Sequence, residues 1–455
     1  MAMISENPAN GQIIAEYEET TDQEVRTIVR RTHEAHLQWK RTPVSHRAAL
    51  MKEAAAVLRL RAREFGELMT LEMGKPITGG VAEVEKCAWV CDYYADNAES
   101  FLADQEVKTD AGRSFITFQP IGVVLAVMPW NFPFWQVFRF AAPNLMAGNS
   151  GLLKHASNVP GCALAIEEVF REAGFPEDLF RTLLVPGSRV EGIIEDPLVR
   201  AVTLTGSTPA GKAVARKAGE ALKKTVLELG GSDPYVLLED ADLDSAVDTC
   251  TTARLVNSGQ SCIAAKRFIV VESVRKAFEE RFVASMAAAK MGDPMEEDTM
   301  VGPQARYDLR EELHDQVVRS IAAGARCLLG GEIPPGPGAF YPPTVLTDVG
   351  PGMAAYDEEL FGPVAAVIPV RDEAEALKVA NDTVFGLGAA VFTGDVERGT
   401  RIAREELEAG ACFVNAFVRS DPRLPFGGVK ESGYGRELSP FGILEFVNIK
   451  TVWVA

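Results

Sequence analysis

The stretch Val123-Val124-Leu125-Ala126-Val127-Met128 is an uncharged apolar run that predicts a buried strand. Similar short runs follow it, and amphipathic segments lie between them. Strands are predicted at 151–153, 182–185 and 201–205, and helices at 162–173, 190–195 and 208–221. This alternation is typical of a mostly parallel sheet with right-handed crossovers. The region therefore predicts an α/β domain.

A second series of the same kind begins near residue 228. The predicted strands are at 235–238, 268–271, 364–370, 389–392 and 412–414, and the turn-rich stretch 330–343 predicts a surface loop. We therefore predict an α/β fold with two tandem doubly wound domains.

The N-terminal region is predicted to be helical. Thr21-Asp22-Gln23-Glu24 has the pattern of a capping box, in which Thr21 and Glu24 satisfy each other's backbone donors. Further helices are predicted at 48–60, before a C-cap at Gly74, and at 81–103.

Charge and composition restrict the partners. The chain has 455 residues and a formal net charge of -18, which argues against nucleic-acid binding because phosphate contacts need a basic face. No charged residue lies between Arg113 and Arg139, and this run is long enough to cross a bilayer. Prolines at 120, 129 and 133 break any continuous helix, so we expect no membrane span.

The seven cysteines are scattered and odd in number. With no start that resembles a secretory signal, reduced thiols and a cytoplasmic location are expected. Cys87 and Cys91 lie four apart, but no matching histidine pair accompanies them, so we expect core residues and no metal site.

Three segments carry candidate chemistry. Cys262 ends the uncharged stretch Asn257-Ser258-Gly259-Gln260-Ser261-Cys262, Glu228 begins Glu228-Leu229-Gly230-Gly231, and Asn131 lies between two prolines in Pro129-Trp130-Asn131-Phe132-Pro133. A thiol can attack a carbonyl carbon, and a carboxylate can activate the water that later releases the product. A lone buried cysteine is more often a small apolar filler, so the interpretation depends on all three segments.

These segments, with Glu359-Leu360-Phe361-Gly362-Pro363 and Pro425-Phe426-Gly427-Gly428, resemble the aldehyde dehydrogenase superfamily in order and spacing. The likeness covers the chain from about residue 1 to its C-terminus and is strongest to the succinate-semialdehyde dehydrogenases. It implies that Cys262 is the nucleophile and Glu228 the general base. It also implies that Asn131 and the backbone N–H of Cys262 stabilise the oxyanion, and that water accepts the acyl group.

The resemblance also implies a dinucleotide site. Ser207, after Gly206, begins a helix whose free N–H groups would bind the pyrophosphate. Glu359 would hold the nicotinamide ribose, and Trp130, Leu229 and Phe361 would line the cleft. Many family members have a glutamate at the position of Ser157 that would repel a 2′-phosphate. Serine there, with Lys154 in reach, favours NADP, with NAD as a less preferred cofactor.

The predicted substrate contacts are Trp135, Arg139, Ser261 and Ser420. In similar semialdehyde dehydrogenases an arginine at the position of Arg139 binds the distal carboxylate of the substrate. An internal ion pair is nearly as good an interpretation from the residues alone, because a buried arginine needs an anionic partner of some kind. Ser420 is a further candidate donor, whereas the neighbouring Arg419 could simply face solvent.

Three functional alternatives stay open. One is another short aldehyde or semialdehyde, such as glutarate semialdehyde. A second is a nucleotide triphosphatase, because the stretch from Gly206 to Lys212 fits most of the phosphate-loop pattern and Asp240 could imitate the acidic partner, although Ala213 lacks the hydroxyl that would bind magnesium. A non-catalytic relative is the third.

The resemblance implies three parts: a dinucleotide-binding domain at 1–106 and 121–228, a catalytic domain at 229–430, and an oligomerisation element at 107–120 and 431–455. The apolar C-terminal segment would be an aggregation-prone edge if it were exposed. We therefore expect a homodimer or homotetramer.

Overall fold

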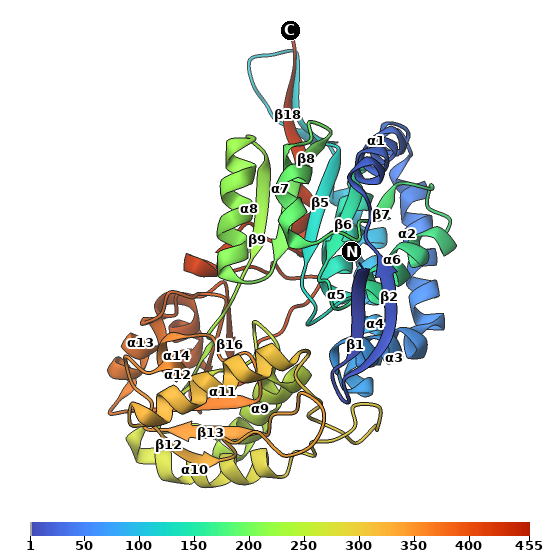
Figure 1. Ribbon diagram of the computed structural model, residues 1–455. Helices are drawn as coiled ribbons and strands as arrows, with labels where there is room; N and C mark the ends of the chain where they lie inside the picture. The colour runs from blue at the N-terminus through green and yellow to red at the C-terminus, as the bar shows by residue number, and fades with distance from the viewer. Residues whose placement is uncertain (1) are drawn as a thin grey trace.

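The computed structural model describes residues 2–455 as two α/β units and a projecting β arm (Figure 1). The first unit is built around a six-stranded sheet that is parallel except for its edge strand β17. In spatial order its strands are β17 (Gly433–Tyr434), β9 (Lys224–Glu228), β8 (Val199–Thr205), β5 (Val123–Met128), β6 (Ser150–His155) and β7 (Phe180–Thr182).

The second unit contains a seven-stranded sheet, in which only the edge strand β12 is antiparallel. Its strands in spatial order are β12 (Arg326–Leu329), β13 (Thr344–Thr347), β14 (Val364–Val370), β11 (Arg267–Val271), β10 (Pro234–Leu237), β15 (Gly388–Phe392) and β16 (Ala411–Val414). The prediction of two α/β domains around mostly parallel sheets is confirmed.

Helices cover both sheets. Those of the first unit are α1 (Asp22–Trp39), α2 (Val44–Leu60), α3 (Ala62–Met73), α4 (Ile77–Phe101), α5 (Trp135–Met146), α6 (Pro160–Glu172), α7 (Val190–Glu195), α8 (Thr208–Glu220) and α15 (Ser439–Leu444). Those of the second unit are α9 (Leu243–Leu255), α10 (Glu272–Ala287), α11 (Tyr307–Ala322), α12 (Ala354–Asp357), α13 (Glu373–Asn381) and α14 (Val396–Arg401), followed by a π-helical turn at Ile402–Glu406.

The predicted helix ends agree closely with the structure. Thr21 forms the reciprocal capping box with Glu24, and Gly74 ends α3 in the left-handed conformation at φ 75°. The N-terminal prediction is incomplete, because a hairpin of β1 (Ala2–Asn7) and β2 (Gln12–Glu18) precedes α1. The strand predicted at 182–185 is observed two residues earlier, as β7 at Phe180–Thr182. Leu179 and Phe180, just before the predicted start, are already buried.

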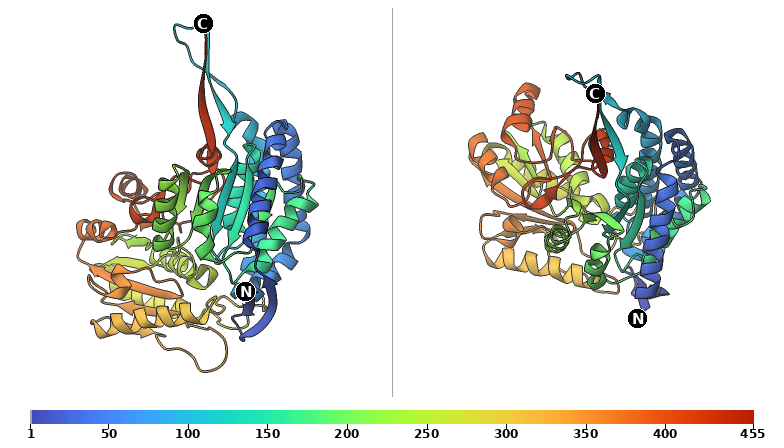
Figure 2. Two further views of the ribbon diagram at one scale, coloured as in Figure 1. Left: turned by 45° about the horizontal axis from the view of Figure 1, so that its top comes forward. Right: turned by 90° about the horizontal axis from the view of Figure 1, so that it is seen from above.

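The arm is a three-stranded antiparallel sheet that projects from the body (Figure 2). It consists of β18 (Val447–Val454), β4 (Arg113–Pro120) and β3 (Gln105–Glu106), so the C-terminal segment pairs with β4 of its own chain. Gly433–Tyr434 instead extends the first sheet beside β9. The three-part domain division stays a prediction.

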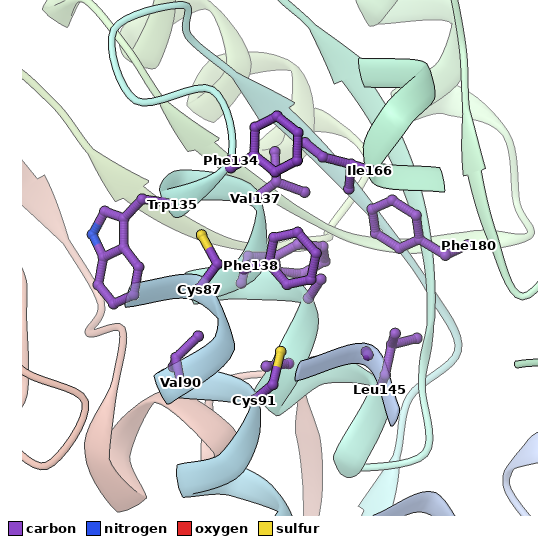
Figure 3. Close-up of a cluster of buried hydrophobic side chains, with 14 of the residues drawn as sticks. Cys87, Val90, Cys91, Phe134, Trp135, Val137, Phe138, Leu145, Ile166 and Phe180 are labelled. Atoms are coloured by element: carbon purple, nitrogen blue, oxygen red, sulfur yellow. The ribbon is translucent and has the colours of Figure 1, made fainter. Parts of the chain in front are cut away.

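The largest buried cluster is formed mainly by residues of α1 to α6, and Figure 3 shows the part of it around α4 and α5. Cys87 and Cys91 point into it beside Phe134 and Phe138, and both thiols are fully buried. Packing therefore explains these two cysteines. None of the helices within residues 2–455 is long and apolar enough to cross a membrane.

Candidate active site

Cys262 lies after a tight turn whose backbone is unusual. Asn257, Ser258 and Gly259 have φ values of 52°, 56° and 76°, so three consecutive residues are left-handed. Such a conformation costs a non-glycine residue roughly 1–2 kcal/mol. Buried Arg254 holds the turn by donating from Nη2 to the Gly259 carbonyl at 2.7 Å. The position of the thiol is therefore fixed by a backbone that the surrounding structure holds in place.

Close backbone contacts bring the motif-bearing segments of the sequence together around Cys262. A Cβ on Gly231 would lie 2.6 Å from the Cys262 carbonyl oxygen, and a Cβ on Gly259 would lie 2.2 Å from the Gly362 backbone. Only glycine permits such approaches. The segments that begin at Glu228 and Glu359 therefore pack directly against the turn that carries the thiol.

Lys266 ties this turn to Glu359. Its buried Nζ donates to the carbonyls of Ser261 at 3.0 Å and Cys262 at 2.8 Å, and it forms an ion pair with Glu359 Oε1 at 3.3 Å. Glu359 also accepts from the Gly231 N–H at 3.0 Å. The carboxylate predicted to hold the ribose is thus connected to the backbone of the nucleophile.

Asn131 is fixed beside the same turn. Its Nδ2 donates to the Gln260 carbonyl at 3.0 Å, its Oδ1 accepts from Gln136 Nε2 at 3.1 Å, and its carbonyl accepts from Asn257 Nδ2 at 2.7 Å. An amide nitrogen carries two protons, so one stays available for an oxyanion. This arrangement agrees with the predicted role of Asn131.

Two cavities meet at Cys262. The substrate chamber, of about 590 Å³, is lined by Trp135, Arg139, Ser261 and Ser420 among others. The cofactor chamber, of about 490 Å³, lies on the other side. Cys262 and Gln136 line both chambers. A carbonyl carbon bound next to the Cys262 sulfur could therefore be reached by a ligand in either chamber.

Six of the eight predicted cofactor residues line the cofactor chamber, together with Asn131; they are Trp130, Gly206, Ser207, Leu229, Glu359 and Phe361. Trp130 and Phe361 meet edge to face with ring centroids 5.7 Å apart. Lys154 and Ser157 lie outside this chamber, at the carboxyl end of β6. Because β5, β6 and β8 are parallel, all three strands end at the same edge of the sheet.

Glu228 lines neither chamber. Its side chain is buried at the end of β9, and a Cβ on Gly427 would lie 2.6 Å from its Oε1. Burial and the neighbouring Glu437 raise the pKa of Glu228 well above its usual range. The carboxyl group must therefore turn toward Cys262 before it can act there.

Arg139 lines the substrate chamber and is also paired with a carboxylate. It forms a buried ion pair with Glu437, and Nη2 donates to Thr205 Oγ1 at 3.4 Å. Its guanidinium also lies 4.5 Å from the centre of the Phe426 ring. The internal ion pair is present, but a guanidinium has five donors, so the substrate contact of Arg139 stays a prediction.

The family model described as "Aldehyde dehydrogenase family" matches residues 2–452. The chain belongs to the aldehyde dehydrogenase family. Two similar sequences are a probable NADP(+) succinate-semialdehyde dehydrogenase of Synechocystis sp., 53% identical over all of both chains, and the NADP(+) enzyme of Mycolicibacterium paratuberculosis, 51% identical over 100% of this chain and 97% of the relative. The crystal structure of succinic semialdehyde dehydrogenase from Streptococcus pyogenes with NADP+ has 38% identity and a TM-score of 0.97 over all of both chains.

The fold of this aldehyde dehydrogenase argues against the nucleotide triphosphatase alternative. Lys212 is exposed and pairs with Glu431 at 2.9 Å, and Asp240 lies in the second unit, where it accepts from Thr393 at 2.8 Å. The two residues therefore do not share a phosphate site. Within residues 2–455, no group of three or more His, Cys, Asp or Glu side chains is arranged to hold a metal ion.

Several residues at this aldehyde dehydrogenase site escaped the sequence analysis. Lys266 had a signal, because a Lys-Arg pair that opens a buried strand must have internal partners. Gln136 and Glu437 had none beyond their proximity to recognised segments. Lys86, on α4, lines the substrate chamber and donates to Ser420 Oγ at 2.8 Å, and helix periodicity alone could not show this.

Alkylation of Cys262 in the cofactor-free enzyme should depend steeply on pH. Burial raises the pKa of Cys262 to about 12, although the nearby Lys266 opposes this effect. Only the thiolate reacts, so the rate with iodoacetamide should rise about tenfold per pH unit from neutral pH to about pH 9. Cys262→Ala supplies the background from the other thiols. A plateau below pH 8 would show that the thiol is activated in the free protein.

Proposed function

We propose that this chain oxidises succinate semialdehyde to succinate with NADP as the preferred cofactor. The observation that carries the proposal is the position of Cys262 at the junction of the two chambers, with Asn131 beside it. The NADP(+) enzymes named above support the cofactor and the substrate, because they are about half identical to this chain over its whole length.

The residues present fit a dinucleotide. Ser207 is the N-cap of α8, makes no side-chain cap bond, and lines the cofactor chamber. Free N–H groups at a helix start favour a phosphate. Lys154 is buried, burial lowers its pKa, and it has no ion-pair partner within residues 2–455. An additional phosphate near Lys154 and Ser157 would compensate that cation.

The chemistry begins at the sulfur. The Cys262 thiolate attacks the aldehyde carbon, a C–S bond forms, and the carbonyl oxygen becomes an oxyanion. Asn131 Nδ2 and the Cys262 N–H, which has no backbone acceptor within residues 2–455, would stabilise that charge. The bound cofactor supplies the acceptor for the hydride that leaves this carbon. A thioester on Cys262 results.

Hydrolysis completes the cycle. Glu228 turns from its buried position, takes a proton from water, and the hydroxide adds to the thioester carbon. Collapse of this adduct breaks the C–S bond, which releases the carboxylic acid and the Cys262 thiolate. The raised pKa of Glu228 suits a general base, because its basic form becomes available as the pH rises.

Steady-state kinetics across aldehydes and both dinucleotides test the proposal. Succinate semialdehyde with NADP should give the highest kcat/KM in a panel that includes glutarate semialdehyde and butanal. Comparable values for NADP and NAD, or a preference for NAD, would overturn the cofactor assignment. A higher kcat/KM for glutarate semialdehyde would favour that alternative substrate.

Ser157→Glu should reverse the cofactor preference. A carboxylate there would repel a 2′-phosphate and bond ribose hydroxyls instead, so kcat/KM with NADP should fall about 10- to 100-fold while NAD loses far less. The ratio of the two kcat/KM values is the measurement. Ser273→Glu, at an exposed position in α10, adds the same charge in the second unit as a control. An unchanged ratio would remove Ser157 from the cofactor site.

We also propose a homodimer or homotetramer assembled through the arm. Ile449, Trp453 and Val454 are 61%, 52% and 48% exposed, and all three lie on the one strand β18 of the projecting arm. A partner subunit would cover this edge. A cytoplasmic location is proposed as well, supported by seven cysteines that are all free thiols.

A further inference from the structure

The side-chain amide of Asn131 has two ends of opposite character, and only one of them can stabilise an oxyanion. A half-turn about the last bond of the side chain exchanges the donor Nδ2 for the acceptor Oδ1. With Oδ1 toward the developing negative charge, the amide would repel that charge instead of stabilising it. The hydrogen-bond partners of Asn131 therefore decide whether this residue helps the reaction.

The nitrogen end of the Asn131 amide has a partner that it shares. Nδ2 donates to the Gln260 carbonyl at 3.0 Å, and Asn257 Nδ2 donates to the same carbonyl at 3.1 Å. The Gln260 carbonyl therefore keeps a donor, from Asn257, whichever way the Asn131 amide faces. This contact alone is a weak restraint on the orientation of Asn131.

The oxygen end of the Asn131 amide is held by Gln136. Oδ1 accepts from Gln136 Nε2 at 3.1 Å and from no other donor in the part of the chain that the structure describes. Both side chains are buried. A half-turn of Asn131 alone would place two N–H groups against each other, and loss of the Gln136 donor would leave a buried oxygen without a partner. Gln136 thus supplies the second restraint.

Gln136 is itself placed by the start of α5. Glu83 Oε1 accepts from the N–H groups of Phe134 and Trp135 at 2.9 Å each, which fixes the first turn of the helix. The Oε1 of Gln136 is buried and has no hydrogen-bond donor in the described chain. A buried amide oxygen without a donor is unfavourable, so packing does not explain a glutamine at this position. The bond from its Nε2 to Asn131 does.

We propose that Gln136 is a positioning residue, which holds the Asn131 amide with Nδ2 toward the oxyanion. It also strengthens that donor, because an amide whose oxygen accepts a hydrogen bond is polarised and donates more strongly from its nitrogen. Gln136 lines both chambers, as Cys262 does, so this contact lies beside the sulfur. The inference rests on the proposed oxyanion role of Asn131.

Gln136→Met removes the donor and keeps a side chain of similar length. With the best aldehyde of the panel above, kcat/KM should fall about 5- to 30-fold, mainly through kcat, because the contact matters most when the oxyanion forms. Dinucleotide affinity, measured by fluorescence titration, should not change. Gln38→Met makes the same substitution at an exposed position of α1 and should leave both quantities unchanged.

The decisive comparison repeats the substitution in the Asn131→Ala background. Asn131→Ala alone should lower kcat/KM about 10²- to 10³-fold, because an oxyanion donor is lost. Since Gln136 acts through Asn131, Gln136→Met should then cause almost no further loss. A glutamine that only supports the fold would instead cost the same factor in both backgrounds.

The outcomes separate the inference from the proposed function. If Gln136→Met behaves like wild type, or loses the same factor with and without Asn131, the positioning role of Gln136 is overturned while the role of Asn131 stands. If Asn131→Ala keeps the wild-type kcat/KM, the proposed oxyanion donor fails and the inference fails with it. Dinucleotide binding shows whether each variant is folded, and Gln136→Leu repeats the test with a smaller side chain if Gln136→Met does not bind.

Discussion

Replacing Cys262 with alanine should abolish aldehyde oxidation, with an expected loss in kcat of at least about 10⁴-fold. No other thiol can take its place, because Cys262 is the only cysteine within residues 2–455 that lines either chamber. Without the sulfur neither the thiohemiacetal nor the thioester can form. Formation of reduced dinucleotide, followed by absorbance, is the measurement.

The control for this variant is Cys327→Ala. Cys327 lies on the edge strand β12, is exposed, and should be replaceable without loss of turnover. Dinucleotide binding, followed by fluorescence, should persist in Cys262→Ala and would show that the fold is intact. Substantial dehydrogenase activity in Cys262→Ala would refute the assignment of the nucleophile.

Replacing Glu228 with glutamine should leave the first turnover and slow the later ones. The amide cannot take a proton from water, so hydrolysis of the thioester should become limiting and kcat should fall about 10²- to 10⁴-fold. Rapid mixing should still show a burst of reduced dinucleotide close to one equivalent per site. Glu228 would then be the base for hydrolysis rather than for the initial attack.

The pH profile gives an independent check on Glu228. Burial raises the pKa of Glu228, so its basic form appears only as the pH rises. The kcat of the wild-type enzyme should therefore increase with pH, which gives the pH profile a rising limb. The limb should be missing in Glu228→Gln. If the burst of reduced dinucleotide and the steady-state rate of Glu228→Gln fall together, or if this variant keeps the rising limb, Glu228 is not the base. Its role would then be to support the structure around Gly427.

Much of the fold could be predicted because its signals are local. Val123–Met128 is apolar throughout and is a fully paired strand, and Thr21 and Glu24 are close enough in sequence to cap a helix on their own. The hairpin at β1 and β2 was missed. In β1 the buried positions are Met3 and polar Ser5, whereas apolar Ile4 is exposed, and β2 has no buried residue, so no alternation of apolar and polar residues marks the two strands.

The candidate active site also has a part that the sequence could predict and a part that it could not. Cys262, Asn131 and Glu359 lie in short segments whose residue types and order already indicate their chemistry, and the structure brings these segments into contact through Gly231 and Gly259. The partner of a buried charge is different, because it depends on which distant segments fold together. Arg139 finds Glu437, and Lys86 finds Ser420, from parts of the chain that no local pattern connects. Long-range packing selected these partners, and for Arg139 the cost of leaving a buried charge unpaired explains the choice.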